Sequence, residues 1–289
     1  MGKSIQCIFA TAVSLLTLSS AANASSDGHD QVSDETIAEQ RHMLAISTMD
    51  AGFGPQSPRD IDLAKGENHR AFEPAPAYAQ MDLCDIHFHE NAEHKGGEFT
   101  TFAGNGDGHG YGTGFKYSGE LSEAELADVG KEFGVTEHGS LVPGDTIEVH
   151  YVYSTAKATL GPTLGTCFSE AVVNPQLRVE TQVYVLVNDP DALDFVELVK
   201  IEVVDGLNQA VGIPSNTGTP IQYAGSTTGP GYNEIGSPYQ ATWSVRPQVA
   251  KVNILTVGAW LAGNVFDEDH AHGVRNLVTN PNLLSNISQ

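Results

Sequence analysis

The sequence predicts one β-rich domain of the α+β class, with few short helices and long loops. Many short segments have the β-branched and aromatic content of strands, whereas helical patterns are limited to two stretches. The segments between them are dense in glycine, proline and small polar residues, which is typical of loops. The expected strands cover residues 82–89, 146–154, 177–187, 195–204, 240–245 and 249–261.

The first residues have the pattern of a secretory signal peptide. Lys3 precedes an apolar stretch at residues 8–18, and Ala22-Asn23-Ala24 has the small residues of a cleavage site. Residues 1–24 are therefore expected to be removed. The apolar stretch is too short to span a membrane, and no later run of about 18 apolar residues occurs. We expect an exported protein, periplasmic or secreted, without membrane insertion.

The next segment is polar and acidic. Residues 25–50 are expected to form a mobile N-terminal arm, with a short helical pattern at residues 35–44. The folded domain then covers residues 51–289. It begins with an irregular segment at residues 52–80 that is rich in glycine, proline and charged residues.

Three further segments of the domain have a distinct composition. Residues 104–114 alternate glycine with other residues, which predicts a loop or a tight ribbon. Residues 122–133 predict the clearest short helix, with Ser122 as N-cap and acidic residues in the first turn. Residues 206–238 are rich in Gly, Pro, Ser, Thr and Asn, so long loops are expected there.

The charge of the chain limits its partners. The formal net charge is −22, which argues against nucleic acid and anionic membranes. A small neutral substrate would be unaffected by such a field.

Two cysteines remain once Cys7 is removed with the signal peptide. In an oxidising compartment, an even pair predicts a disulfide between Cys84 and Cys167. In the chain-entropy model, closing so long a loop stabilises the fold by about 4–5 kcal/mol. The bridge would lie three residues before His87 on the same strand. A thiolate metal ligand is the competing interpretation of Cys84.

The motif His87-Phe88-His89 lies on an expected strand. Residues i and i+2 of a strand share one face, so both imidazoles are able to bind one metal ion. The strand at residues 146–154 carries one further imidazole, His150. Three neutral histidines with one coordination position left open are typical of a catalytic zinc site.

Two acidic residues support these ligands. Asp85 shares a strand face with His87, and Glu148 shares one with His150. Each is placed to accept the second ring N–H of an imidazole, which fixes its orientation. A second H-x-H pair, His270 and His272, lies in a polar and loop-like context, so solvated side chains are expected there.

These motifs resemble the zinc site of alpha-type carbonic anhydrases, in which an H-F-H pair, a later S-E-H and an E-L-H-x-V strand form the active centre. The matching segments here are His87-Phe-His89, Ala92-Glu93-His94 and Glu148-Val-His150-Tyr-Val. Four more segments agree in order, namely residues 54–62 (GPQSPRDID), 225–230 (GSTTGP), 241–243 (ATW) and 274–281 (VRNLVTNP). The short spacing between His89 and Glu93 is more like that of the delta class of carbonic anhydrases. The chain therefore resembles the delta class more than the alpha class.

The resemblance implies a central, mostly antiparallel twisted sheet and a catalytic domain at residues 51–289. It also implies reversible hydration of carbon dioxide to bicarbonate and a proton by zinc-bound hydroxide. One Zn²⁺ per chain would be held by His87, His89 and His150.

Further roles follow from the same resemblance. Thr227 would accept a hydrogen bond from the hydroxide and pass its own proton to Glu93, with Thr228 beside it. Val152 would line the apolar pocket for carbon dioxide. A base that titrates near neutral pH must then carry the proton away. The candidates for this shuttle are His69, His94 and His109.

Two other interpretations remain. In a cupin-type barrel, the pattern H-x-H-x(3)-E would make Glu93 a fourth ligand beside His87, His89 and His150, and iron or manganese would become plausible. An exported metal carrier without catalysis would need the ligands but not Thr227.

Overall fold

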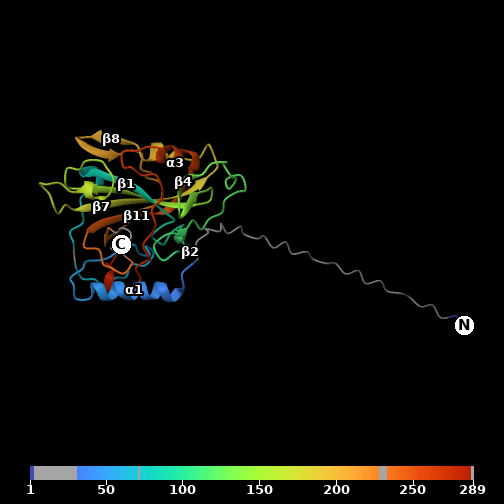
Figure 1. Ribbon diagram of the computed structural model, residues 1–289, viewed down its shortest axis with the longest axis horizontal. Coiled ribbons are helices and arrows are strands. Elements are labelled where there is room, and N and C mark those ends of the chain that lie inside the picture. The colour runs from blue at the N-terminus through green and yellow to red at the C-terminus, as the bar shows by residue number, and fades with distance from the viewer. Residues whose placement is uncertain (3–30, 71, 228–232, 288–289) are drawn as a thin grey trace.

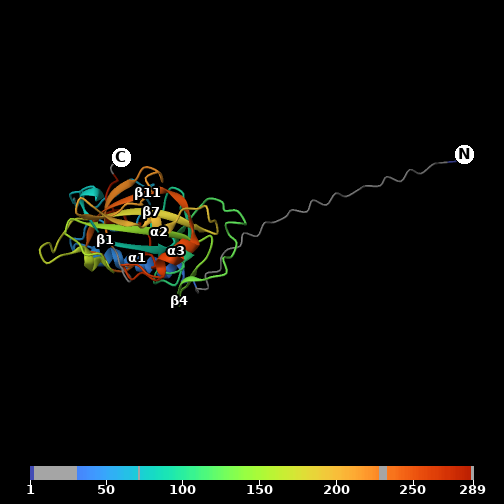
Figure 2. The ribbon, with the colours of Figure 1, turned by 90° about the horizontal axis from the view of Figure 1, so that it is seen from above.

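The 289-residue chain is described by a computed structural model at residues 1–2, 31–70, 72–227 and 233–287. Its centre is a five-stranded sheet, which crosses the middle of the molecule (Figures 1 and 2). In spatial order the strands are β1 (Asp82–Glu90), β6 (Thr146–Ser154), β7 (Leu177–Val187), β11 (Gln240–Asn253) and β10 (Ile221–Ser226). Only the β7–β11 pair is parallel, so the predicted mostly antiparallel sheet is confirmed.

The two faces of the sheet bury different side chains, because successive residues of a strand point to opposite sides. On one face, Phe88 and Tyr151 pack with Phe195 and Trp260 in the larger apolar core. That face is covered by α2 (Phe195–Leu198) and α3 (Ile254–Leu261), which lies above the sheet in Figure 1. The other face carries a smaller apolar core and, beside it, the polar residues of the predicted site.

Short two-stranded ribbons and single turns of 3₁₀ helix complete the fold. The predicted ribbon is confirmed, because the glycine-rich segment joins two antiparallel strands. The ribbons are β2 (Thr101–Asn105) with β3 (Thr113–Lys116), β4 (Phe133–Thr136) with β5 (Gly139–Leu141), and β8 (Ile201–Val204) with β9 (Leu207–Ala210). The 3₁₀ turns are η1 (Tyr78–Gln80), η2 (Leu164–Cys167) and η3 (Pro281–Leu283).

The acidic segment near the N-terminus is not a free arm where it is described. Helix α1 (Asp34–Thr48) begins at Ser33, whose side chain accepts a hydrogen bond from Thr36 N. Its Leu44 packs against Val278, Leu283 and Leu284, below the sheet in Figure 1. Buried apolar contacts dock the helix, which is also longer than the predicted pattern at residues 35–44.

The helix predicted at residues 122–133 is wrong. Ser122 and Glu125 form the expected cap, since Glu125 Oε2 accepts hydrogen bonds from Ser122 N and Oγ. The segment then makes the backbone hydrogen bonds Leu126 N to Ser122 O and Ala127 N to Ala124 O, and the chain turns at Gly130 with φ of 67°. A single turn fixes many dihedral angles for few hydrogen bonds, so it does not propagate without further packing.

Two predicted strands are part helix. Residues 195–204 divide into α2 and β8 because Asp194 Oδ1 accepts from Val196 N and starts a helical turn. Residues 240–245 and 249–253 lie in one strand, β11, with a register shift after Val245, and the rest of the strand predicted at residues 249–261 is helix α3. Strand β11 ends at Asn253, whose side chain caps α3. The loops predicted at residues 206–238 also contain β9 and β10.

The remaining strand predictions, at residues 82–89, 146–154 and 177–187, are confirmed. The predicted disulfide is present between Cys84 and Cys167, so Cys84 is not a thiolate metal ligand. None of the described helices is long and apolar enough to cross a membrane. Most of the predicted signal peptide lies outside the described residues.

Candidate metal centre

The pairing of β1 with β6 brings the predicted ligands together. His87 lies opposite His150, and His89 lies opposite Glu148. Directly opposed residues of an antiparallel pair have their Cβ atoms about 4.5–5.5 Å apart on one face of the sheet. The strand register therefore places the three imidazoles side by side, as the spacing of the sequence motifs predicted.

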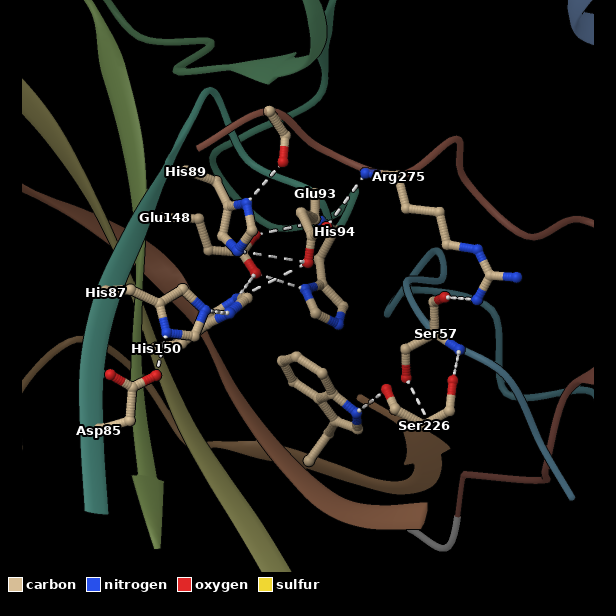
Figure 3. A network of polar contacts seen from close by, with 12 residues as sticks. Ser57, Asp85, His87, His89, Glu93, His94, Glu148, His150, Ser226 and Arg275 are labelled. Atoms are coloured by element: carbon tan, nitrogen blue, oxygen red, sulfur yellow. Dashed lines mark hydrogen bonds and ion pairs between the residues drawn. The ribbon is translucent and has the colours of Figure 1, made fainter. Parts of the chain in front are cut away.

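Each imidazole has one ring nitrogen tied to an acceptor (Figure 3). His87 Nδ1 lies 2.7 Å from Asp85 Oδ2, and His150 Nε2 lies 2.7 Å from Glu148 Oε1. His89 Nδ1 lies 2.8 Å from the carbonyl oxygen of Gly273. Because carboxylate and carbonyl oxygens only accept, these nitrogens carry the protons. The opposite nitrogens, His87 Nε2, His89 Nε2 and His150 Nδ1, then carry lone pairs.

The free nitrogens have the spacing of ligands of one small cation. His87 Nε2 and His150 Nδ1 are 3.3 Å apart, and the three histidines offer nitrogens that all lie within 4.8 Å of one another. In a tetrahedral site with bonds of about 2.0–2.1 Å, two ligand nitrogens are about 3.3 Å apart. Two lone pairs that face each other at this distance are stabilised by a cation between them, so the donor set fits a zinc ion.

The electrostatics keep at least two ligands neutral. Burial lowers the pKa of His89 well below its usual value, and the neighbouring imidazoles lower it further. Burial likewise lowers the pKa of His150 to about 4. Burial also opposes the charged form of His87, but the carboxylates around it, led by Asp85, outweigh this effect and raise its pKa. Metal binding requires the neutral imidazole, so protonation of His87 competes with it at acidic pH.

The pKa values of two buried carboxyl groups are shifted in opposite directions. Burial disfavours ionisation of Glu148, but the imidazoles of His94 and His150 more than compensate, and its pKa is far below the usual range. Burial raises the pKa of Glu93 to about 7, and the charge of Glu148 adds to this increase. Glu148 is therefore the fixed anion of the site, and Glu93 is the carboxyl group that changes charge near neutral pH.

A buried hydrogen-bonded chain continues from Glu148 away from the ligands. Glu148 accepts from both the backbone nitrogen and Nδ1 of His94, and His94 Nε2 lies 2.7 Å from the hydroxyl oxygen of Tyr223. Tyr223 in turn bonds to Ser57 at 2.9 Å. His94 is fully buried and does not line the cavity described next. Its predicted role as a shuttle to solvent is therefore wrong.

The ligands open onto a cavity of about 530 Å³. Its lining includes the apolar side chains of Val152, Val179, Leu164, Phe168 and Trp243. It also includes the polar side chains of His109, Tyr111, Glu268 and His272. Val152 lines this cavity and pairs with Asp85 in the β1–β6 register; its role in a carbon dioxide pocket stays a prediction.

Thr227 and Glu93 both lie at the cavity, but the predicted hydrogen bond between them is not formed. Both residues line the cavity, but the buried Thr227 hydroxyl makes no hydrogen bond within the described part of the chain. Glu93 Oε1 instead accepts from Arg275 N at 3.1 Å, and its Oε2 lies 3.9 Å from His150 Nε2 and 4.0 Å from His89 Nε2. Thr228 lies outside the described residues.

The other predicted shuttle candidates lie in different places. His69 is exposed and lines a separate cavity near the end of α1. His109 is exposed and lines the cavity of the three ligands.

Sequence reasoning did not identify His272 as a residue of the cavity. Its backbone bonds to one edge of β1 before and after His89, donating to Phe88 O and accepting from Glu90 N, and its ring lies 5.5 Å from that of His87 between centroids. Its side chain is 35% exposed and belongs to no group of metal-ligating atoms within the described residues, as expected for a solvated histidine, but it also lines the cavity. The H-x-H spacing was the signal, but a loop gives no face to which its side chains can be assigned.

A protein-family profile matches most of the chain. The profile described as "Delta carbonic anhydrase" matches residues 78–256, which is more than half of the chain and includes all three convergent histidines. The chain belongs to the delta carbonic anhydrase family. This carbonic anhydrase is accordingly a lyase that acts on carbon dioxide. The match ends before His272 and Arg275, which complete the site from the C-terminal segment.

Solved structures of α-carbonic anhydrases are similar to this carbonic anhydrase at low identity. One from Thermovibrio ammonificans, in complex with the inhibitor sulfanilamide, has 15% identity over 77% of this chain and 84% of its own, with a TM-score of 0.28. One from Photobacterium profundum has 14% identity over 82% and 93%, with a TM-score of 0.25. A halotolerant enzyme from Dunaliella salina has 14% identity over 78% and 86%, with a TM-score of 0.29. These scores are too low to carry an argument about shared geometry. No curated protein sequence matches the chain.

The family assignment and the geometry both argue against a cupin-type site. Glu93 is not part of the cluster of close donor atoms formed by His87, His89 and His150. The carboxylates bonded to that cluster are Asp85 and Glu148, which hold the protonated nitrogens of His87 and His150 and leave the opposite ones free.

Proposed function

We propose that this carbonic anhydrase hydrates carbon dioxide at one zinc ion held by His87 Nε2, His89 Nε2 and His150 Nδ1. The observation that carries the proposal is the matched pair of nitrogens on each ring, one fixed by an acceptor and one free and convergent. Four-coordinate zinc with three protein ligands keeps one position for the reactants.

Zinc supplies one property that the side chains lack. It lowers the pKa of a coordinated water molecule from 15.7 to about 7, which makes a nucleophile available at neutral pH. The residues of the chain orient the ligands, place carbon dioxide and hold the protons.

Thr227 and Glu93 orient the attacking oxygen in this proposal. The Thr227 hydroxyl has no partner within the described residues, so it is free to accept a hydrogen bond from that oxygen and to donate its own proton to Glu93. A nearby cation favours the ionised form of Glu93 over the protonated form that burial favours. Thr228 is proposed as the neighbouring pocket residue.

Apolar side chains that line the cavity place the substrate. Carbon dioxide has no charge, and the side chains of Val152, Val179 and Trp243 lie beside the ligands in the cavity. Such a lining excludes ordered water from the space next to the metal and leaves it to an apolar molecule.

The decisive experiment combines metal analysis of the mature protein with stopped-flow measurement of carbon dioxide hydration. We expect one zinc per chain and hydration activity, both lost in His150→Ala and both retained in His42→Ala, which changes an exposed histidine of α1. In Thr227→Ala we expect zinc to be retained while kcat/KM falls by about 10²-fold, the size of effect seen when one positioned hydrogen-bonding group is removed. Zinc without hydration would indicate a metal carrier.

Export remains part of the proposal. Residues 1–24 are proposed to be a signal peptide, with a periplasmic or secreted mature protein that begins at Ser25 and has its catalytic domain at residues 51–289. Expression of the full sequence in a bacterium, followed by mass spectrometry of the product, tests this. Recovery of the uncleaved chain from the cytoplasm would contradict it.

A further inference from the structure

The C-terminal loop that runs beside β1 carries a carboxylate and an imidazole into the cavity. Glu268 Oε2 lies 2.6 Å from His272 Nε2, and both side chains line the cavity of the three ligands. Because a carboxylate only accepts, His272 Nε2 carries the proton, and the neutral ring has its lone pair on Nδ1. This Nδ1 makes no hydrogen bond within the described part of the chain. His272 thus repeats the arrangement of each ligand, with one ring nitrogen tied to an acceptor and the other free.

The fold holds both members of this pair in place. Asn264 Oδ1 accepts from Glu268 N at 3.2 Å, and Asn264 Nδ2 donates to Glu268 O at 2.7 Å. These bonds close the loop around Phe266, which is buried in the larger apolar core. The backbone of His272 forms a parallel bridge with His89 on β1. The same loop therefore fixes the carboxylate, the imidazole and their position beside the ligands.

The ring of His272 lies next to two ligand rings without joining the ligand cluster. Its centroid is 5.5 Å from that of His87 and 5.9 Å from that of His89. Burial lowers the pKa of His87, and Glu268 is among the carboxylates that more than offset this effect, so its charge acts at the ligands. No cluster of donor atoms within 4.8 Å of one another includes His272 among the described residues. His272 is therefore a neighbouring donor and not a fourth ligand of the same ion.

The exposure of the side chains decreases from this pair toward the ligands. The exposed fraction is 35% for His272, 21% for His87, 9% for His89 and 4% for His150. A buried metal site needs an entry path, and an ion that comes from solution through the cavity meets the most exposed imidazole first. The carboxylate of Glu268 beside this imidazole attracts a cation there.

We propose that His272, supported by Glu268, is a transfer ligand on the path by which zinc enters and leaves; this inference rests on the zinc site proposed above. Zinc is bound first by His272 Nδ1, and this nitrogen is then replaced by the ring nitrogens of His87 and His89, with His150 completing the set. Release follows the reverse order. His272 holds the ion only in passing, so the resting site keeps its open position.

The test measures how fast zinc binds and leaves, at one pH and without a hydration assay. Metal-free protein is mixed with zinc in a stopped-flow instrument, and release is followed by transfer to a chromophoric chelator, extrapolated to zero chelator. In His272→Ala we expect both rate constants to fall by about tenfold, while the Kd changes by less than about threefold. Loss of a transfer ligand raises the barrier equally in both directions. The matched control is His270→Ala, which should change neither rate constant.

A second variant separates the charge of the pair from its imidazole. In Glu268→Gln the amide oxygen still accepts from His272 Nε2, but the negative charge is gone. We expect the association rate constant to fall by about two- to fivefold at low salt, and the difference from the parent to shrink at high salt. Glu197→Gln removes an equal charge from an exposed residue of α2, on the opposite face of the sheet, and should change the rate constant less.

Chemical modification tests whether zinc reaches His272 directly. Diethylpyrocarbonate modifies accessible imidazoles, and mass spectrometry locates the modified residues. In protein with one zinc per chain, His272 should be modified. Zinc added beyond one per chain should protect His272, and should leave the exposed His42 of α1 as reactive as before.

Several results would overturn the inference. These are unchanged rate constants in folded His272→Ala, a faster release with a matching loss of affinity, an equal slowing in His270→Ala, equal effects of Glu268→Gln and Glu197→Gln, or no protection of His272 by added zinc. A parent protein that binds zinc but does not hydrate carbon dioxide would overturn the proposed reaction alone, because these measurements follow the metal and not the reaction.

Discussion

The chain contains two H-x-H pairs with the same spacing and different surroundings. His87 and His89 lie on β1, and both point to one face of the sheet toward His150. His270 and His272 lie in a C-terminal loop, where their rings stack at 5.6 Å between centroids. His272 lines the cavity, whereas His270 is partly exposed and pairs with Asp269.

The difference shows what makes two imidazoles into metal ligands. Spacing alone does not, because both pairs have it. In the strand pair, each Nδ1 is held by an acceptor and the Nε2 atoms point at a third imidazole. In the loop pair, Glu268 holds His272 Nε2 and Asp269 holds His270 Nδ1, and no convergent cluster of donor atoms includes either histidine within the described residues.

The largest expected effect comes from the strand pair itself. His89→Ala removes one of three ligand nitrogens and leaves the tetrahedral site with two, so we expect loss of stoichiometric zinc and of hydration. Metal analysis after dialysis, with circular dichroism to confirm folding, checks this. A folded variant that keeps one zinc per chain would show that the strand pair is not the ligand pair.

The buried carboxyl next to the strand pair gives a pH-dependent effect on stability. Burial and the charge of Glu148 raise the pKa of Glu93 to about 7. The folded state therefore resists ionisation of Glu93, and the metal-free protein should lose stability as the pH rises from about 4.5 to about 7, by up to about 3 kcal/mol. In Glu93→Gln this contribution is absent at all pH values.

Urea unfolding of the metal-free protein and of Glu93→Gln at pH 5 and pH 8, in the presence of a chelator, measures this contribution. The pKa of His87 is also raised, in part by the charge of Glu93, so the difference between the two proteins measures Glu93 together with its interaction with His87. Equal changes in the two proteins would mean that Glu93 is solvated or already ionised at pH 5.

Much of the strand-borne site was predictable, because a strand turns sequence spacing into spatial position. Residues 146–154 and 177–187 have the composition of strands and form β6 and β7 with those bounds. From them, the common face of Glu148 and His150 follows by alternation. The acceptor roles of Asp85 and Glu148 were predicted in the same way.

The parts of the site that depend on tertiary contacts were not predictable. Gly273 O reaches His89 only because the C-terminal loop runs beside β1. Likewise, Glu148 binds His94 across 54 residues. The short helices α2 and α3 were missed because single caps at Asp194 and Asn253 decide between helix and strand in segments of strand-like composition.

A matched pair of carboxylate variants sharpens the contrast between the two H-x-H pairs. Asp85 and Glu268 each bond to an imidazole, at 2.7 Å and 2.6 Å, but only Asp85 orients a proposed ligand. Asp85→Asn should weaken zinc binding by about 10–100-fold, and Glu268→Gln should change it far less. Competition with a chromophoric chelator measures both affinities. Equal losses would mean that the loop pair contributes to the metal site.

The smallest effect is expected at the outer residue of the loop pair. His270 is partly exposed, and its partner Asp269 is more exposed still. Such an ion pair contributes about 0–1 kcal/mol because water screens it. His270→Ala should therefore leave zinc affinity unchanged and shift the free energy of unfolding by less than about 1 kcal/mol. The ring of His270 stacks on that of His272, which lines the cavity. A tenfold loss of zinc affinity in His270→Ala would accordingly show that the loop pair acts as a unit, and that H-x-H spacing matters even without a strand to align it.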